Sequence, residues 1–434
     1  MLQTGSRRFL ILLYAWMPLL LQAQTLELVF DSAVVPISLQ KLIADVIQKH
    51  PQITVQNAAV HVAEAGVQGA QWQFYPTPSI TMESANVSAG DTSYGGDRHV
   101  SVLGLRQTLW NGGRLTASLD KAKAAVTLSS AIREESKQQL ALRVIQSYGD
   151  WIAAFEKQKV YLSGLSLHRQ MKEMVVRRVQ EGLSAHSDQI LAEERLALLE
   201  ADALASASQK RTALLKLSQL AGLSVNELSL AQAPTSTRLN DSPLATLLQL
   251  VDSHSPTLAR YRAVARMQLS AVIERKADVW PEIYARVERQ YGNFSIAGLQ
   301  TVNRAFVGVA TRFGAGLSTQ TAIAEAMGQH EAALAEIEVQ RLSLQEQVMV
   351  DHTMLMDSET RRIALKEGAA KSRQVLQSWD RQFFSGRKSW QDLMNSAREQ
   401  IQMEVQIADL EAARLIASWR LFALTEPELL MGSL

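Results

Sequence analysis

The sequence predicts a mainly α-helical chain that also contributes a few strands to a membrane β-barrel. Three observations lead to this fold class. The 434 residues include only 22 glycines and 10 prolines, fewer than the many turns of an all-β protein need. Turn residues recur in register in the two halves of the chain. Each half also holds a pair of short segments in which apolar and polar residues alternate, as they do in strands.

Composition excludes several classes of protein. Lys and Arg number 44 against 43 Asp and Glu, so the net charge of +1 gives no sign of the basic face of a nucleic-acid binder. A hydrophobic content of 47% is too high for a disordered chain. The absence of cysteine excludes disulfides, thiolate metal sites, cysteine nucleophiles and a lipidated N-terminal cysteine.

The N-terminal segment is typical of a secretory signal peptide. Arg7 and Arg8 precede an apolar run over residues 9–21, and the small residue Ala23 follows shortly after it. This run is shorter than the ~20 residues that a membrane-spanning helix needs. We therefore expect residues 1–23 to be removed on export, with a membrane anchor as the alternative.

The chain is expected to consist of two copies of one unit, at residues 38–222 and 243–426, joined by a linker at 223–242. Pro76 corresponds to Pro281, 205 residues later, and Gly182 corresponds to Gly386, 204 residues later. Overall identity between the copies is barely above chance, so the prediction rests on turn residues that keep register.

Each copy is predicted to contain a broken helix, a β-hairpin, a long helix, a tight turn and a last helix. The first and last helices together are about as long as the long one, so they can stack end to end beside it. On the helices alone, an elongated coiled coil is the alternative. The expected ranges are 38–74 for the first helix, broken at Pro51, 77–110 and 282–314 for the two hairpins, and 114–180 and 187–221 for the long and last helices of the first copy.

The strands favour a membrane barrel over a small soluble sheet, which is the alternative. Ile283, Ala285 and Val287 alternate with polar residues, and Val307 and Val309 share one face of the next strand. Four strands with one polar face suit a membrane barrel, but four cannot close it, and open edges are not tolerated in lipid. Three chains supply twelve strands, so we expect a homotrimer. Aromatic residues of the kind that form a membrane-interface belt gather at the strand–helix junctions: Trp72, Phe74, Tyr75, Trp110 and Trp280.

This order of elements, and the residues at its turns, resemble the TolC-type outer-membrane efflux and secretion channels. Three segments carry the resemblance: residues 107–114, where a strand becomes a helix, and the helix turns at 178–184 and 384–393. The resemblance covers nearly all of the mature chain and departs at residues 313–316, which read Phe-Gly-Ala-Gly where the first copy has Gly-Gly-Arg. It implies a trimer whose twelve-stranded barrel in the bacterial outer membrane is continuous with a long α-helical periplasmic tunnel.

The resemblance also implies a function and partners. It implies a passive channel of a tripartite export system, with outer-membrane lipid, a periplasmic adaptor (membrane fusion) protein and an inner-membrane transporter as partners. Residues 386–390 look most like those of the type I secretion members that export large adhesins, which implies a protein cargo and an ATP-driven exporter. The alternatives are the channel of a drug or metal efflux pump and, from another class, a periplasmic helical-hairpin adaptor or structural protein.

No catalytic, cofactor or metal site is expected, and the chain is not expected to be an enzyme. The phosphate-binding loop, the H-E-x-x-H zinc motif and the G-x-S-x-G nucleophile motif are all missing from the sequence. The eight histidines are scattered, with no pair at metal-ligand spacing on one helix face.

The two helix turns hold the candidate functional residues. Asp188 and Asp392 each lie six residues after a turn glycine, Gly182 and Gly386. In a trimer they bring six carboxylates near the narrow end of the tunnel, where clustered acids attract cations and repel one another. Because a glycine can take a positive φ at a sharp reversal, we expect the turns to form tips where the adaptor docks. The tip residues are Gly182, Leu183, Gly386 and Arg387.

The resemblance assigns gate roles to residues near these tips. Asp392 matches the first of two acids that line the periplasmic constriction, and Asn395 stands in place of the second. Asp188 and Lys388 match a contact that holds the entrance closed, and Phe383 stands where a tyrosine can join it. A local alternative for Asp392 is a capping box with Ser389, which is compatible with the gate.

Overall fold

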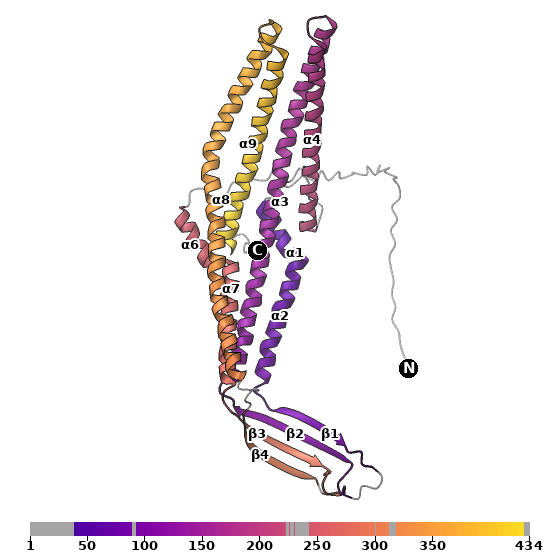
Figure 1. Cartoon of the computed structure of the whole chain (residues 1–434), viewed down its shortest axis with the longest axis vertical. Helices are drawn as coiled ribbons and strands as arrows, with labels where there is room; N and C mark the ends of the chain where they lie inside the picture. The colour runs from indigo at the N-terminus through magenta and orange to yellow at the C-terminus, as the bar shows by residue number, and fades with distance from the viewer. Residues whose placement is uncertain are drawn as a thin grey trace, which may run out of the picture. The chain divides into compact units, whose positions relative to one another are not determined.

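The computed structural model describes residues 39–88, 93–222, 225, 230, 243–299, 301–311 and 318–428. The expected signal peptide, most of the expected linker and residues 313–316 lie outside the described residues. The helices are α1 (Leu39–Lys49), α2 (Pro51–Trp72), α3 (Arg114–Gln180), α4 (His186–Ala221), α6 (Leu244–His254), α7 (Pro256–Ala277), α8 (Ser318–Phe384) and α9 (Trp390–Thr425) (Figure 1). The strands are β1 (Thr77–Ser84), β2 (His99–Trp110), β3 (Glu282–Tyr291) and β4 (Val302–Ala310).

The described helices of the two halves have matching lengths. α1 and α6 each have 11 residues, α2 and α7 have 22, α3 and α8 have 67, and α4 and α9 have 36. Each half places its strand pair between the second and third of these helices. The equal lengths support the proposal that the chain arose from two copies of one unit.

The break predicted at Pro51 is present, and its cause is local. A proline offers no N–H and disfavours the helical conformation in the residue before it, so a helix ends there and another begins. His50 accepts a hydrogen bond from the N–H of Gln52 through Nδ1 at 3.2 Å. In the second half, Ser255 precedes Pro256 and accepts from the N–H of Leu258 at 3.3 Å. Both halves thus form a short first helix and a longer second one.

The long helix α3 is the centre of the helical part. It packs against α2 and α7 along one stretch and against α4 and α9 along the other, as Figure 1 shows. α1 contacts both α2 and α4, so the end-to-end stacking expected from the helix lengths is confirmed. The largest apolar cluster forms where these helices meet, around the fully buried Trp151 and Tyr148 of α3, with Leu39 of α1 and Leu217 of α4. Among the described helices, none contains a stretch with the length and hydropathy of a membrane-spanning segment.

The strands form one antiparallel sheet in the order β1-β2-β3-β4. Each strand therefore pairs with its neighbours in sequence, and the two hairpins join through β2 and β3. The register shifts between Thr108 and Trp110, a bulge close to the junction with α3. β1 and β4 are the two edges, and each has only one hydrogen-bonded neighbour among the described strands.

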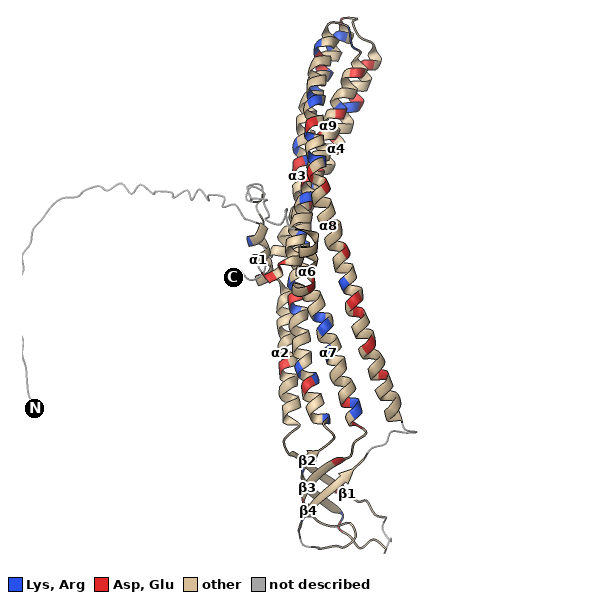
Figure 2. Cartoon of the chain, turned by 90° about the vertical axis from the view of Figure 1, so that its left-hand side faces the viewer, with Lys and Arg blue, Asp and Glu red and all other residues tan. Residues whose placement is uncertain are grey.

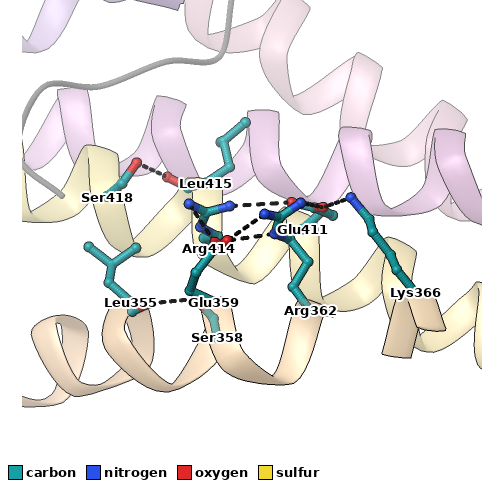
Figure 3. A network of polar contacts seen from close by, with 9 residues as sticks. All are labelled: Leu355, Ser358, Glu359, Arg362, Lys366, Glu411, Arg414, Leu415 and Ser418. Carbon is teal, nitrogen blue, oxygen red and sulfur yellow. Dashed lines mark hydrogen bonds and ion pairs between the residues drawn. The ribbon is translucent and has the colours of Figure 1, made fainter. Parts of the chain in front are cut away.

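Ion pairs join α8 to α9. Glu411 of α9 lies 2.9 Å from Nζ of Lys366, and Arg414 lies 3.0 Å from Glu359, which also contacts Arg362 (Figure 3). These side chains are partly exposed, so solvent screens each pair and it adds little to stability. Charges of both signs are interspersed along the helices seen in Figure 2, which fits the net charge of +1.

A further pair between α8 and α9 is buried. Nε of Arg420 lies 2.8 Å from Oδ2 of Asp351, whose side chain is only 2% exposed. Burial raises the pKa of Asp351 above its ordinary value, although Arg420 and Gln347 oppose this shift. Such a pair adds little net stability, but removing one partner leaves an uncompensated buried charge.

We expect Arg420→Met to lower the free energy of unfolding by about 3–5 kcal/mol, because Asp351 loses its buried partner. The deficit should shrink at acidic pH. A carboxyl whose pKa is raised in the folded state favours folding as pH falls through that raised value, because protonation removes the buried charge. Urea unfolding followed by circular dichroism at neutral and acidic pH measures both effects.

The matched control is Arg373→Met, which breaks the 2.8 Å pair with Glu404, where the arginine side chain is 60% exposed. This change should cost about 1 kcal/mol or less. Equal losses in the two variants, or a deficit of Arg420→Met that grows at low pH, would show that Asp351 is not a buried charge held by Arg420.

Candidate functional site

The sheet has one apolar and one polar face, and large apolar side chains of the apolar face are exposed. The antiparallel register places Ile80 opposite Leu103, and Ala285 opposite Val307, so apolar side chains gather on one face. Ile80 is 67% exposed and Val307 is 77% exposed. A soluble sheet buries its apolar face, so this one requires an apolar environment outside the chain. Its large exposed apolar residues are Ile80, Met82, Leu103, Leu105, Val287, Val307 and Val309.

The polar face is built from side chains that contact one another across the strands. Arg106 lies 3.4 Å from Glu282 and stacks over Tyr284, with Cζ 3.8 Å from the ring centroid. Thr108 donates to the same glutamate at 2.8 Å. On the next strand, Arg286 lies 3.1 Å from Glu288. The alternation in the sequence predicts the polar face but not these contacts, because the contacts depend on which residues the register brings opposite each other.

The aromatic residues expected at the strand–helix junctions do gather there. Trp110 at the end of β2 and Trp280 before β3 make an edge-on contact with ring centroids 6.0 Å apart. Trp72 and Tyr75 lie 5.3 Å apart at the end of α2. Gly112 lies against Trp280, where an added Cβ would come within 2.5 Å of the tryptophan Cβ. These exposed rings therefore mark one level of the molecule, between sheet and helices.

At the other end of the sheet, Asp97 ties the two hairpin loops together. Its carboxylate accepts backbone hydrogen bonds from Asn293 at 2.8 Å and from Gly298 at 3.0 Å. Its own N–H donates to the carbonyl of Asn293 at 2.7 Å. The bonds from Gly298 and Asn293 lower the pKa of Asp97. No pattern in the sequence predicts this contact, because the partners of Asp97 lie about two hundred residues away and are backbone groups.

The two helix turns at the far end of the helical part have the same geometry. Gly182 and Gly386 both have φ of 73°. Leu183 donates to the carbonyl of Arg178 at 2.8 Å, and Arg387 donates to that of Gln382 at 2.9 Å. These bonds close the Schellman motif, which requires a left-handed residue and favours glycine. A Cβ added at either glycine would meet no atom within 4 Å. The positive φ, and not crowding by neighbours, is therefore what favours glycine at these two positions.

Asp392 forms the predicted capping box. Its N–H donates to Oγ of Ser389 at 3.1 Å, and its carboxylate accepts from the N–H of Ser389 at 3.3 Å. These bonds, followed by the charge of Lys388, lower the pKa of Asp392. Nζ of Lys388 lies 3.8 Å from Asp392 and 4.1 Å from the ring centre of Trp379. The box and the gate role are compatible, and the exposed Asn395 lies one turn further along α9.

The other expected gate residues lie near the two helix turns. Asp188 lies in the first turn of α4, and no described residue of the same chain forms an ion pair with it. The Asp188–Lys388 contact therefore remains a prediction for the assembled protein. Phe383 is only 4% exposed, because it packs against Trp390 with ring centroids 5.4 Å apart. Leu183 and Arg387 are exposed at the two tips.

Comparisons with known proteins agree with this architecture. The structure is similar to VceC, an outer membrane protein from Vibrio cholerae, with a TM-score of 0.76 at 14% identity over 89% of this chain and 96% of that one. It is also similar to the CmeC outer membrane channel of Campylobacter jejuni, with a TM-score of 0.74 at 12% identity over 89% and 85% of the two chains. At this level of identity, the likeness shows the fold.

The Neisseria gonorrhoeae MtrE outer membrane channel, in its open state, gives a TM-score of 0.71 at 14% identity over 90% of this chain and 92% of that one. Among curated proteins, none matches the chain significantly. Residues 42–223 match the family described as outer membrane efflux protein. Residues 42–223 thus resemble the outer membrane efflux proteins in sequence, and both halves of the chain share the fold of outer-membrane channels.

Proposed function

We propose that three copies of the chain close a twelve-stranded barrel in the outer membrane and form a passive conduit for export. The observation that carries the proposal is the sheet, which exposes its apolar face and has two open edges. A strand edge in lipid has no water to satisfy its N–H and C=O groups, so the edges must pair. Pairing β1 of one chain with β4 of the next, three times over, closes four strands per chain into twelve.

The two faces then have different surroundings. The apolar face contacts lipid, and the polar face, with Arg106, Arg286 and their partner acids, lines the lumen. The exposed rings of Trp72, Trp110 and Trp280 fit the interface between the membrane and the periplasm, where aromatic side chains are enriched. The polar lumen continues into a tunnel formed by the helices of the three chains.

The tips are proposed as the periplasmic entrance, where the adaptor docks and the channel opens. Lys388 lies 3.8 Å from Asp392, and both side chains are partly exposed. A pair of this kind is weak, so Lys388 can exchange between Asp392 and the proposed partner Asp188. Docking then has only a small free energy to overcome when it opens the entrance.

For the cargo, we propose a protein exported with the help of an ATP-driven inner-membrane transporter. The support is the segment 386–390, which resembles that of the type I secretion members. The family description, outer membrane efflux protein, favours a second candidate, the channel of a small-molecule efflux pump. Identifying the inner-membrane protein that copurifies with the crosslinked chain separates the two, because an ATP-driven exporter implies the first and a proton-driven pump the second.

The barrel is tested by acidic substitutions on neighbouring residues of β1. Ile80 lies on the apolar face and Thr81 on the polar face. We expect Ile80→Asp to reduce the amount of trimer recovered from outer membranes, because a carboxylate that faces lipid is destabilising, although by less than the ~2–4 kcal/mol that a lysine costs at the middle of the membrane. Thr81→Asp should have little effect, because its side chain faces water. Both residues are exposed in the single chain, so equal recovery of the two variants by crosslinking and fractionation would contradict the barrel.

Docking at the tips is tested by Gly386→Val. A β-branched residue is strained at φ of 73°, so the turn should deform and transport should fall while the trimer stays in the membrane. The control is Gly298→Val, which introduces the same strain at φ of 73° in a loop at the opposite end of the chain. Normal export by the Gly386 variant, or an equal loss in the Gly298 variant, would count against docking at the tips.

The gate is tested by Lys388→Glu, which replaces attraction to Asp188 and Asp392 by repulsion. If three weak pairs hold the entrance closed, their loss should raise single-channel conductance in planar bilayers. The control is Ser389→Ala, which removes the cap of α9 and about 1 kcal/mol of helix stability but leaves both charges. Unchanged conductance in the lysine variant would restrict Asp392 to its capping role.

A further inference from the structure

Two arginines lie directly opposite each other on the polar face of the sheet. The register pairs Arg106 of β2 with Arg286 of β3. Like charges in directly opposite positions destabilise a sheet unless other groups compensate for them. The surroundings of this pair therefore show how it is kept in place.

Each arginine side chain stacks on an aromatic ring and forms an ion pair with an acid. Cζ of Arg106 lies 3.8 Å from the ring centroid of Tyr284, and its Nη2 lies 3.4 Å from Glu282. Cζ of Arg286 lies 4.8 Å from the ring centroid of Phe306, and its Nη1 lies 3.1 Å from Glu288. Ring stacking and ion pairing orient both guanidinium groups before any ligand arrives.

The exposures show which charge faces the lumen. The two arginine side chains are each 41% exposed, whereas those of Glu282 and Glu288 are 18% and 19% exposed. The acids thus lie beneath the guanidinium groups, and this level of the polar face presents mainly positive charge. Arg304, which the register places opposite Glu288, is also exposed and donates to Gln290 at 3.1 Å.

We propose that Arg106 and Arg286 form an anion-binding ring inside the barrel. The inference rests on the proposed trimer, in which two arginines in each of three chains give six guanidinium groups at one level. A guanidinium is charged at every physiological pH and binds carboxylate or phosphate through paired N–H groups. The ligands are therefore the carboxylate or phosphate groups of exported molecules, held briefly on their way out.

The ring and the entrance acids lie at opposite ends of the conduit and have opposite signs. An anion added on the side of the hairpin loops reaches the arginines without crossing the entrance. Asp188 and Asp392 lie at the helix turns, at the opposite end of the conduit, and as acids they should not bind the anion. Comparing block by an anion added on one side or the other of the membrane therefore distinguishes the arginine ring from the entrance acids.

The test is block of the channel by inorganic tripolyphosphate, with carboxylate tested as citrate, in planar bilayers bathed in potassium chloride. Added on the loop side, tripolyphosphate should reduce the current of the wild-type channel. The double variant Arg106→Gln, Arg286→Gln should need about tenfold more of it for half block, because each charge-assisted hydrogen bond is strong. Glu282→Gln should lower the concentration needed, because it frees Arg106 from its partner.

The matched control is Arg289→Gln, which removes the same charge three residues further along β3, on the apolar face. Its block should equal that of the wild type. A double variant that is blocked as easily as the wild type would overturn the ring, and so would an equal loss of block in Arg289→Gln. If the double variant does not insert, unchanged block in Glu282→Gln overturns it. A wild-type chain that carries no current at all would instead contradict the proposed function.

Discussion

The pairing of strand edges is the constraint on which the rest of this molecule depends. Within one chain, β1 and β4 each leave a row of backbone N–H and C=O groups without a strand neighbour. Water can satisfy such groups, but lipid cannot. The exposed apolar face calls for lipid rather than water on that side of the sheet, so the edges of one chain need those of another. The proposed trimer, the lumen and the tunnel all follow from this need.

In the proposed trimer, the helices extend the same arrangement into the periplasm. Because α3 and α8 have 67 residues each, the two halves present long helices of equal length to the assembly. The breaks at Pro51 and Pro256 let the shorter helices follow the long ones in two segments. The pairs between α8 and α9 are mostly partly exposed, so they hold the hairpin together without making it rigid.

Much of this fold could be predicted from the sequence, and the reason is local. Pro51 breaks a helix wherever it stands in one, and a glycine such as Gly182 takes the left-handed turn whatever surrounds it. The alternation in β3 likewise predicted which residues share a face. The capping box of Ser389 and Asp392 spans only four residues, so it could also be predicted from the sequence.

What the sequence left open depends on residues that are distant along the chain. The alternation predicts a polar face but not that Arg106 lies opposite Arg286, because register is set by pairing. Lys388 offers a similar case. Its spacing suits Asp392 one turn later, whereas resemblance suggested Asp188 of the other hairpin, and within the single chain only the near partner is in contact. Asp97 binds backbone groups, which leave no pattern in a sequence.

The clasp made by Asp97 has a consequence for how the outer surface of this protein evolves. In the proposed trimer, the hairpin loops lie at the end of the sheet that faces away from the periplasm. Asp97 holds the second loop through the N–H groups of Asn293 and Gly298, which every residue except proline possesses. The clasp therefore places no demand on the side chains of that loop, apart from the left-handed φ of 73° at Gly298, and an insertion between its two donors is what it resists. The loop is permissive in sequence and conservative in length.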